Sequence, residues 1–274
     1  MEQNIIESED YIDYKPPISV DINQLGGTIP ISLYNEDIKT CPHRSYLIIN
    51  GKLTLKKNSD GVILSSIDTK KVNFINNGIL HLFSRINYSI AGNEIDSVDN
   101  PGTATAIKGL VSFNDDIAYH DACWRIKSTS NIINKDGYFS IFIPLKVILG
   151  FFEDYTKYIY RIHQELKLIR ANTNCNNALL VDETIASAHT ITISLSEIIW
   201  RMPQYKFSLA YEAEINKEIS SSIEYEMYYR HWMYIEKSSI TGKTLTWDIP
   251  TSYYKPRYVI IGFQKNKNDK ISGY

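Results

Sequence analysis

The fold is decided by the stretch Arg44-Ser45-Tyr46-Leu47-Ile48-Ile49-Asn50-Gly51-Lys52-Leu53-Thr54-Leu55. Aromatic, β-branched and leucine side chains dominate it, and such residues favour the pleated, half-buried surface of a β-strand. The pair Asn50-Gly51 interrupts the run and is typical of either a hairpin turn or a bulge. Both alternatives belong to a sheet, so the stretch predicts β structure in either case.

Outward from this stretch, short runs of the same kind recur between turn signals such as Asp60-Gly61 and Asp136-Gly137. The predicted strands cover residues 28–33, 62–67, 79–90, 138–143, 165–170, 190–195, 198–202, 225–235, 244–249 and 257–263. Many short strands with one or two helices in the connections predict an all-β protein, and specifically an antiparallel jelly-roll sandwich.

Two segments predict helices in the connections between strands. From residue 145 onward, apolar side chains recur at spacings of three and four, the period of one helix face. They are Leu145, Ile148, Leu149, Phe152, Tyr155, Ile159 and Ile162. Pro144 stands just before them, where its missing N–H is tolerated. We expect a helix of about four turns over residues 145–161 and a second, weaker helix over residues 206–219.

The composition fits a folded protein with one large domain or two smaller ones. The 274 residues are 43% hydrophobic and 22% charged, which provides enough apolar side chains for a core. The formal net charge of −2 gives the whole chain no attraction to nucleic acid, so no direct, sequence-specific nucleic-acid partner is predicted. The 20 tyrosines favour β structure and subunit interfaces.

No targeting or membrane segment stands out. Residues 1–10 are polar and acidic and lack the apolar region of a secretory signal peptide. No stretch approaches the roughly 18 apolar residues of a membrane-spanning helix. The three cysteines, Cys41, Cys123 and Cys175, are far apart and lack the CxxC spacing of a zinc site. These features predict a protein that is not secreted and has no membrane span.

Chemically reactive residues occur in isolation rather than in catalytic sets. Thr241-Gly242-Lys243-Thr244 resembles part of a phosphate loop but lacks the glycine five positions upstream. His120 lies three residues from Cys123 without an oxyanion-donor motif. The acidic pairs Asp115-Asp116 and Glu153-Asp154 could hold a metal, although solvated carboxylates are more common. We therefore predict no catalytic, cofactor-binding or metal-binding residues, and no enzyme.

One short motif occurs twice. Pro42-His43-Arg44-Ser45-Tyr46-Leu47-Ile48-Ile49 is similar to Tyr254-Lys255-Pro256-Arg257-Tyr258-Val259-Ile260-Ile261. In each copy a proline is followed by a basic residue, a tyrosine and an aliphatic run. An internal duplication would produce such a pair, and so would chance similarity between two strands. A duplication would place the start of a second domain near residue 225.

Five stretches carry a resemblance to a known family. They are Ser45-Tyr46-Leu47-Ile48-Ile49-Asn50-Gly51-Lys52-Leu53; Phe74-Ile75-Asn76-Asn77-Gly78 with Leu82-Phe83; Asn87-Tyr88-Ser89-Ile90-Ala91-Gly92-Asn93-Glu94-Ile95-Asp96; Ile143-Pro144-Leu145 running into Leu149-Gly150-Phe151-Phe152-Glu153-Asp154-Tyr155; and Lys255-Pro256-Arg257-Tyr258-Val259-Ile260-Ile261-Gly262-Phe263-Gln264. In this order they resemble the double jelly-roll-like domain family. Its members are encoded in animal genomes and mobile elements and look like major capsid proteins of double-stranded DNA viruses.

The resemblance implies a structural protein, a capsid-type subunit that self-assembles through homotrimers into a viral or virus-derived icosahedral shell. Its partners would be other copies of the chain, neighbouring capsomers and minor capsid proteins. The protein would be found in the virion or, when unassembled, in the cytoplasm or nucleus.

The resemblance also divides the chain. We expect a flexible N-terminal arm over residues 1–24 and a complete first jelly roll over residues 25–203. Residues 204–274 are then a connecting helix and the opening strands of a second roll. Family members continue past the strand that begins Lys255-Pro256-Arg257-Tyr258, so the second roll is expected to be partial here.

A jelly roll also suits other functions. The alternative is a lectin-like binding module without catalytic activity, in which exposed rings such as Trp232 and Trp247 stack on a ligand. It requires a concave aromatic surface that stays open, whereas a structural role places these rings in a core or an interface. A cupin-type enzyme would need histidines that converge on a metal, and the 6 histidines are scattered.

Overall fold

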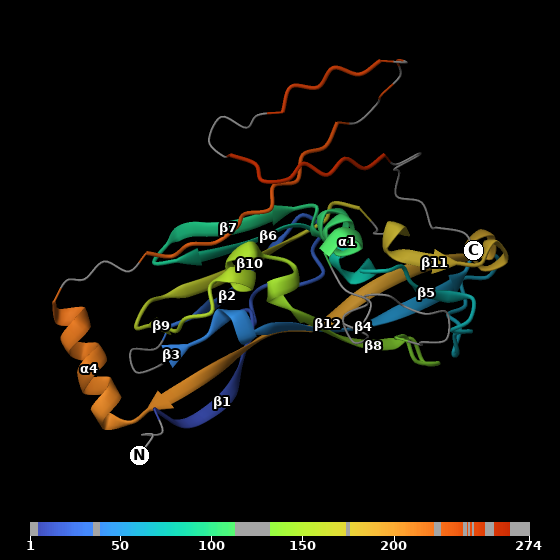
Figure 1. The fold of residues 1–274 in the computed structure, drawn as a ribbon. Coiled ribbons are helices and arrows are strands. Elements are labelled where there is room, and N and C mark those ends of the chain that lie inside the picture. The colour runs from blue at the N-terminus through green and yellow to red at the C-terminus, as the bar shows by residue number, and fades with distance from the viewer. Residues whose placement is uncertain are drawn as a thin grey trace.

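Two antiparallel sheets face each other across one apolar core in the computed structural model (Figure 1). The structure describes residues 5–34, 39–112, 132–173, 176–221, 226–237, 240, 242, 244–249 and 255–263. The core takes side chains from both sheets, among them Ile29 and Leu168 from one and Leu47 and Trp200 from the other, all fully buried.

The larger sheet, here called the β12 sheet, has six strands. They are β1 (Ile6–Tyr14), β3 (Lys39–Thr40), β4 (Tyr46–Lys57), β8 (Tyr138–Pro144), β9 (Ile159–Tyr160) and β12 (His189–Phe207). β12 pairs antiparallel with β4 along most of its length and with β1 near its C-terminal end, and β4 pairs in turn with β8. The order of the long strands is therefore β1-β12-β4-β8.

The second sheet, the β10 sheet, has four strands in the order β2-β10-β6-β7. They are β2 (Thr28–Leu33), β6 (Phe83–Ile90), β7 (Asn93–Asp99) and β10 (Gln164–Arg170). A two-stranded sheet of β5 (Val72–Phe74) and β11 (Leu179–Val181) lies at one end. Four long strands face four others, and the chain passes back and forth between the sheets. This arrangement is a jelly roll and confirms the predicted fold class.

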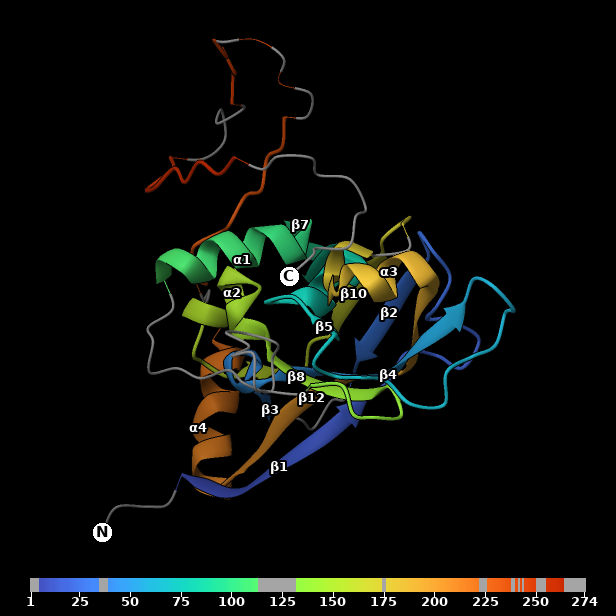
Figure 2. The same ribbon diagram turned by 90° about the vertical axis from the view of Figure 1, so that its right-hand side faces the viewer.

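The helices lie in the connections. The α-helices are α1 (Pro101–Ser112), α2 (Gly150–Asp154), α3 (Glu183–Ala188) and α4 (Leu209–Ser220), and the 3₁₀ turns are η1 (Pro42–Arg44), η2 (Gly78–Leu82), η4 (Leu145–Val147) and η5 (Asn176–Ala178). α4 coincides with the weaker helix predicted over residues 206–219. It lies at the β1–β12 end of the roll in both views (Figures 1 and 2).

A buried chain of hydrogen bonds joins the two sheets. The Tyr88 hydroxyl donates to Gln164 Oε1 at 2.8 Å, and Gln164 Nε2 donates to Thr40 Oγ1 at 2.8 Å. All three side chains are buried, and Thr40 comes from the β12 sheet whereas the other two come from the β10 sheet. Because unsatisfied polar groups are costly in a core, this chain favours one alignment of the sheets.

The Asn50-Gly51 pair is not a turn, because β4 continues through it without interruption. A bulge does occur there, but the extra residue, Ser196, belongs to β12. Gly51 is required by close approach: a Cβ at this position would lie 2.6 Å from the Ser194 carbonyl oxygen and 2.4 Å from Phe139 Cζ.

The expected flexible arm over residues 1–24 is wrong for residues 6–14, which form β1, so the roll runs from residue 6 to residue 207 instead of 25–203. The polar sequence hid this strand because most of its side chains are exposed at the edge of the sheet. Ion pairs hold its carboxylates: Glu9 lies 2.9 Å from Arg44 and Asp13 lies 2.5 Å from Arg201. The hydrogen bond from Arg201 lowers the pKa of Asp13.

The four-turn helix expected over residues 145–161 is also wrong. The segment contains η4, the single turn of α2, an irregular stretch and β9. Leu149 interrupts any longer helix because its backbone is extended, with φ −106° and ψ 132°. The apolar spacing reflected burial rather than one helix face, since Ile148, Phe151 and Ile159 are all buried.

The three strands expected after residue 220 are not observed within the described residues of 225–235, 244–249 and 257–263. Two further predicted strands are shorter than expected. Residues 62–67 contribute one bridge, Lys56 to Ile63, and residues 79–82 belong to η2 before β6 begins. A strand exists only where a neighbour completes its hydrogen bonds, and propensity alone does not supply that neighbour.

Gly51→Ala should destabilise the roll by about 1–3 kcal/mol, because the new methyl group must displace a backbone carbonyl in the sheet. Urea unfolding followed by circular dichroism measures the change. Gly262→Ala is the matched control, since its Cβ would sit 3.5 Å from Ile107, an ordinary contact. Equal stability of the two variants would contradict the close packing of β4 against Ser194.

Candidate interaction surface

Residues 227–232, here called the docking segment, pack against the side of the roll beside β7, α1 and α2 (Figure 1, orange). Met227 and Tyr229 contact the core. The Tyr229 ring meets Phe151 of α2 edge to face, with 5.2 Å between the ring centres, and its hydroxyl donates to the Ile95 carbonyl oxygen of β7. The chain after α4 is thus attached to the roll by a specific contact.

Arg230 makes the strongest polar contact of the docking segment. Its backbone N and its Nε donate to Asp154 Oδ2 at 2.7 and 2.9 Å, and its Nη2 donates to Oδ1 at 2.5 Å. Such a two-pronged, charge-assisted contact fixes direction as well as distance. The hydrogen bond from Arg230 lowers the pKa of Asp154 from its ordinary 3.8. The pair therefore stabilises docking fully above that ordinary pKa and loses its effect as the pH falls through the lowered one.

Asp96 is a buried carboxylate that joins three elements. Its Oδ1 lies 2.7 Å from His231 Nδ1, and its Oδ2 accepts a hydrogen bond from the Phe151 backbone N at 2.8 Å. The Asp96 side chain is 1% exposed. Because a buried carboxylate requires partners on both oxygens, its position in β7 ties α2 and the docking segment to the same point.

Lys108 of α1 completes this cluster from the other side. Its Nζ lies 2.7 Å from Glu153 Oε2 and 5.0 Å from the centre of the Trp232 ring. Burial lowers the pKa of Lys108, although the bond to Glu153 opposes that effect. Gly150 admits the segment, because a Cβ there would lie 1.7 Å from the Arg230 carbonyl oxygen.

Beyond the docking segment the chain leaves the roll (Figures 1 and 2, red). All nine residues from 255 to 263 are exposed. Residues 258–263, here called the apolar segment, include Tyr258, Ile261 and Phe263 with exposed fractions of 69%, 69% and 85%. Contiguous apolar surface of this kind marks an interaction site or a tendency to aggregate.

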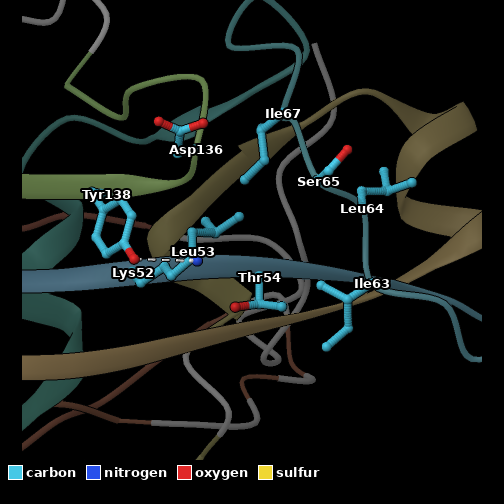
Figure 3. A pocket seen from close by; sticks show the side chains of 9 residues that line it. All are labelled: Lys52, Leu53, Thr54, Ile63, Leu64, Ser65, Ile67, Asp136 and Tyr138. Atoms are coloured by element: carbon cyan, nitrogen blue, oxygen red, sulfur yellow. Dashed lines mark hydrogen bonds between the residues drawn. The ribbon is translucent and has the colours of Figure 1, made fainter.

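A shallow pocket of about 410 Å³ lies at the opposite end of β4, between Lys52, Thr54, Ile63, Asp136 and Tyr138 (Figure 3). Its single aromatic ring is not free to stack on a ligand, because Lys52 Nζ lies over the Tyr138 ring at 4.5 Å from its centre. The two tryptophans considered for a lectin-like site do not line this pocket. Trp232 contacts Lys108 instead, and Trp247 lies in the chain beyond the docking segment.

The structure disperses the residues with candidate chemistry. Glu153 and Asp154 take part in the docking contacts, and the buried Cys41 has its pKa raised by desolvation. His120, Cys123 and the Asp115-Asp116 pair lie outside the described residues, as do Thr241 and Lys243. Within the described ranges, histidine, cysteine and acidic side chains form no group of three suited to a metal ion. None of the described helices is long and apolar enough to cross a membrane.

The docking cluster was not predicted from sequence. Its members come from β7, α1, α2 and the docking segment, which are separated by up to 135 positions along the chain. The one available signal was the acidic pair Glu153-Asp154, which was considered for metal binding and instead binds Lys108 and Arg230.

The fold and the sequence together define a jelly-roll protein with a chain extension docked on its side. The sequence model of the double jelly roll-like domain matches residues 72–273, and the chain belongs to that family. None of the curated proteins matches the chain.

Solved structures with similar folds come from viruses. The chain is similar to PBCV-1 VP54 fitted into a reconstruction of the virophage Sputnik, with 14% identity, a TM-score of 0.47 and coverage of 78% of this chain and 46% of that one. For the Faustovirus major capsid protein the values are 10%, 0.47, 80% and 57%. For the mavirus major capsid protein they are 11%, 0.46, 72% and 46%. The chain thus spans about half the length of these proteins.

Arg230→Gln should loosen the docking segment without unfolding the roll, because it removes the charge that pairs with Asp154. Amide exchange over residues 227–232 should become about tenfold faster or more, as expected for losing a charge-assisted hydrogen bond. Hydrogen exchange with mass spectrometry measures this. Arg257→Gln, on the exposed part of the same extension, is the matched control and should leave exchange there unchanged. Equal exchange in the two variants would contradict the assigned role of Arg230.

Proposed function

We propose that this chain is a capsid-type structural subunit that self-assembles, through homotrimers, into a viral or virus-derived icosahedral shell. The observation that carries the proposal is an exposed apolar segment on a member of the double jelly roll-like family. Members of this family resemble major capsid proteins of double-stranded DNA viruses. The proposed location is the virion, and the proposed partners are other copies of the chain, neighbouring capsomers and minor capsid proteins.

The apolar segment supports self-association because water-exposed apolar surface is stabilised by burial at about 25 cal/mol per Å². Its position is defined by the docking segment, which fixes the chain at Arg230 and His231 before it leaves the roll. A fixed attachment lowers the entropy lost when the exposed residues meet a partner. This suits an assembly subunit that must present the same surface in every copy.

The division of the chain supports the same role. We propose that residues 204–274 contain the connecting helix and the opening strands of a second roll. The repeated motif gives support: in its first copy, Tyr46 to Ile49 begin β4, which has a strand on each side. In the second copy the corresponding Tyr258 to Ile261 are exposed. This difference is expected of a strand whose neighbours come from elsewhere.

A structural rather than a catalytic role is part of this proposal. The described carboxylates of the docking cluster are engaged by lysine, arginine or histidine and serve to attach the chain. The net charge of −2 supports contact with protein rather than direct contact with nucleic acid.

The purified chain should self-associate, and the combined substitution Tyr258→Ser, Ile261→Ser and Phe263→Ser should shift it toward monomer. Size-exclusion chromatography with light scattering gives the mass, with a trimer expected as the assembled species, and negative-stain microscopy reports whether shells form. The control combines Ile18→Ser, Val62→Ser and Leu209→Ser, which remove exposed apolar side chains from other surfaces. A monomeric parent chain at all concentrations would overturn the proposed function.

A further inference from the structure

We propose that the apolar segment of one copy adds as a strand to the free edge of β1 in a second copy. This inference rests on the proposed self-association and names the two surfaces that meet. Addition of an extended segment to a sheet edge uses main-chain hydrogen bonds for affinity and side-chain contacts for selectivity.

β1 provides the accepting edge. Its nine residues pair with β12 on one side, and no other described strand pairs with them. An edge of this kind presents a row of N–H and C=O groups that readily accept another strand. Its apolar side chains are only partly covered: Ile6, Tyr11 and Ile12 have exposed fractions of 41%, 41% and 40%.

The side chains of the two segments are compatible on both faces of the sheet. Tyr11 lies opposite Pro203 and Ile12 opposite Met202, so successive β1 residues present apolar groups on alternate faces. The apolar segment does the same, because Tyr258, Val259, Ile260 and Ile261 follow one another. A neighbouring strand would therefore find apolar contacts on both faces.

Charge favours the same pairing. Within β1 the charged residues are all acidic: Glu7, Glu9, Asp10 and Asp13. Three of them pair with basic residues of their own chain, whereas Asp10 forms no ion pair with any described residue. Lys255 and Arg257 stand just before the apolar segment, and residues 255–263 contain no acid. Opposite charges in neighbouring strands stabilise pairing.

The pairing must occur between copies. β1 and residues 255–263 lie on opposite sides of the roll in both views (Figures 1 and 2). The docking segment holds the extension on the α1–α2 side, with Gly262 only 3.5 Å from Ile107 of α1 by its Cβ direction. The segment therefore cannot reach its own β1 while docked. Two different surfaces then meet head to tail, which closes a ring when the rotation between copies permits.

Disulfide trapping between two variants tests the pairing. Both are full-length chains with Cys41, Cys123 and Cys175 replaced by alanine. One carries Ile12→Cys, and the other carries Ile260→Cys or, for a register one residue different, Ile261→Cys. Mild oxidation of the mixture should give a disulfide-linked heterodimer as the main product on non-reducing gels, and each variant alone should give little.

Two controls make the result specific. Ile18→Cys replaces Ile12→Cys at a fully exposed site outside β1 and should give little heterodimer. Adding Val259→Pro and Ile261→Pro to the Ile260→Cys variant removes two N–H donors from the segment. It should abolish trapping with Ile12→Cys while leaving the melting temperature of the roll unchanged.

The outcomes separate this inference from the proposed function. Self-association with no more heterodimer from Ile12→Cys than from Ile18→Cys would overturn the pairing and leave the capsid-type role standing. A monomeric chain without trapping would overturn both. A single chain carrying Ile12→Cys and Ile260→Cys that closes an internal disulfide as a monomer would also overturn pairing between copies.

Discussion

The pairing of β12 with both β4 and β1 is the constraint on which the rest of the roll depends. Over 19 residues this strand holds β4 along its first two thirds and β1 along its last third, and Trp200 lies where both partners are present. The indole of Trp200 is fully buried and packs 6.2 Å from Tyr88 of the facing sheet. One strand therefore sets the order of the β12 sheet and its distance from the β10 sheet.

The side of the roll follows from that order. β7 is the outer strand of the β10 sheet, so Asp96 is placed where α1 and α2 also end up. A carboxylate buried there requires partners, and α2 provides a backbone N–H while the docking segment provides His231. The attachment of the chain extension is thus a consequence of where the sheet ends, with Arg230 and Asp154 adding direction to it.

The sequence predicts the sheets well where a strand has a buried face. β2 matches its predicted bounds of residues 28–33, and β8 and β10 match within one residue. β1 was missed because its side chains are exposed and acidic, so the alternation that signals burial is absent. The segment after Pro144 misled for the opposite reason: it is buried on all sides, and a helical spacing arose without a helix.

The docking cluster and the exposed segment lay beyond sequence reasoning for another physical reason. Contacts such as Asp96 with His231 depend on how the sheets are layered, and no local pattern carries that information. The repeated Pro-Arg-Tyr motif was visible, but whether its aliphatic run is covered depends on neighbours that propensity does not reveal.

The position of β1 also bears on how the protein is made. β1 is among the first residues to leave the ribosome, yet its partner in β12 ends at Phe207, almost 200 residues later. At roughly 5–20 residues per second, the first strand waits about 10–40 seconds before it can enter its sheet. Its acidic side chains suit that interval, since charge on a waiting strand discourages premature association with other nascent chains.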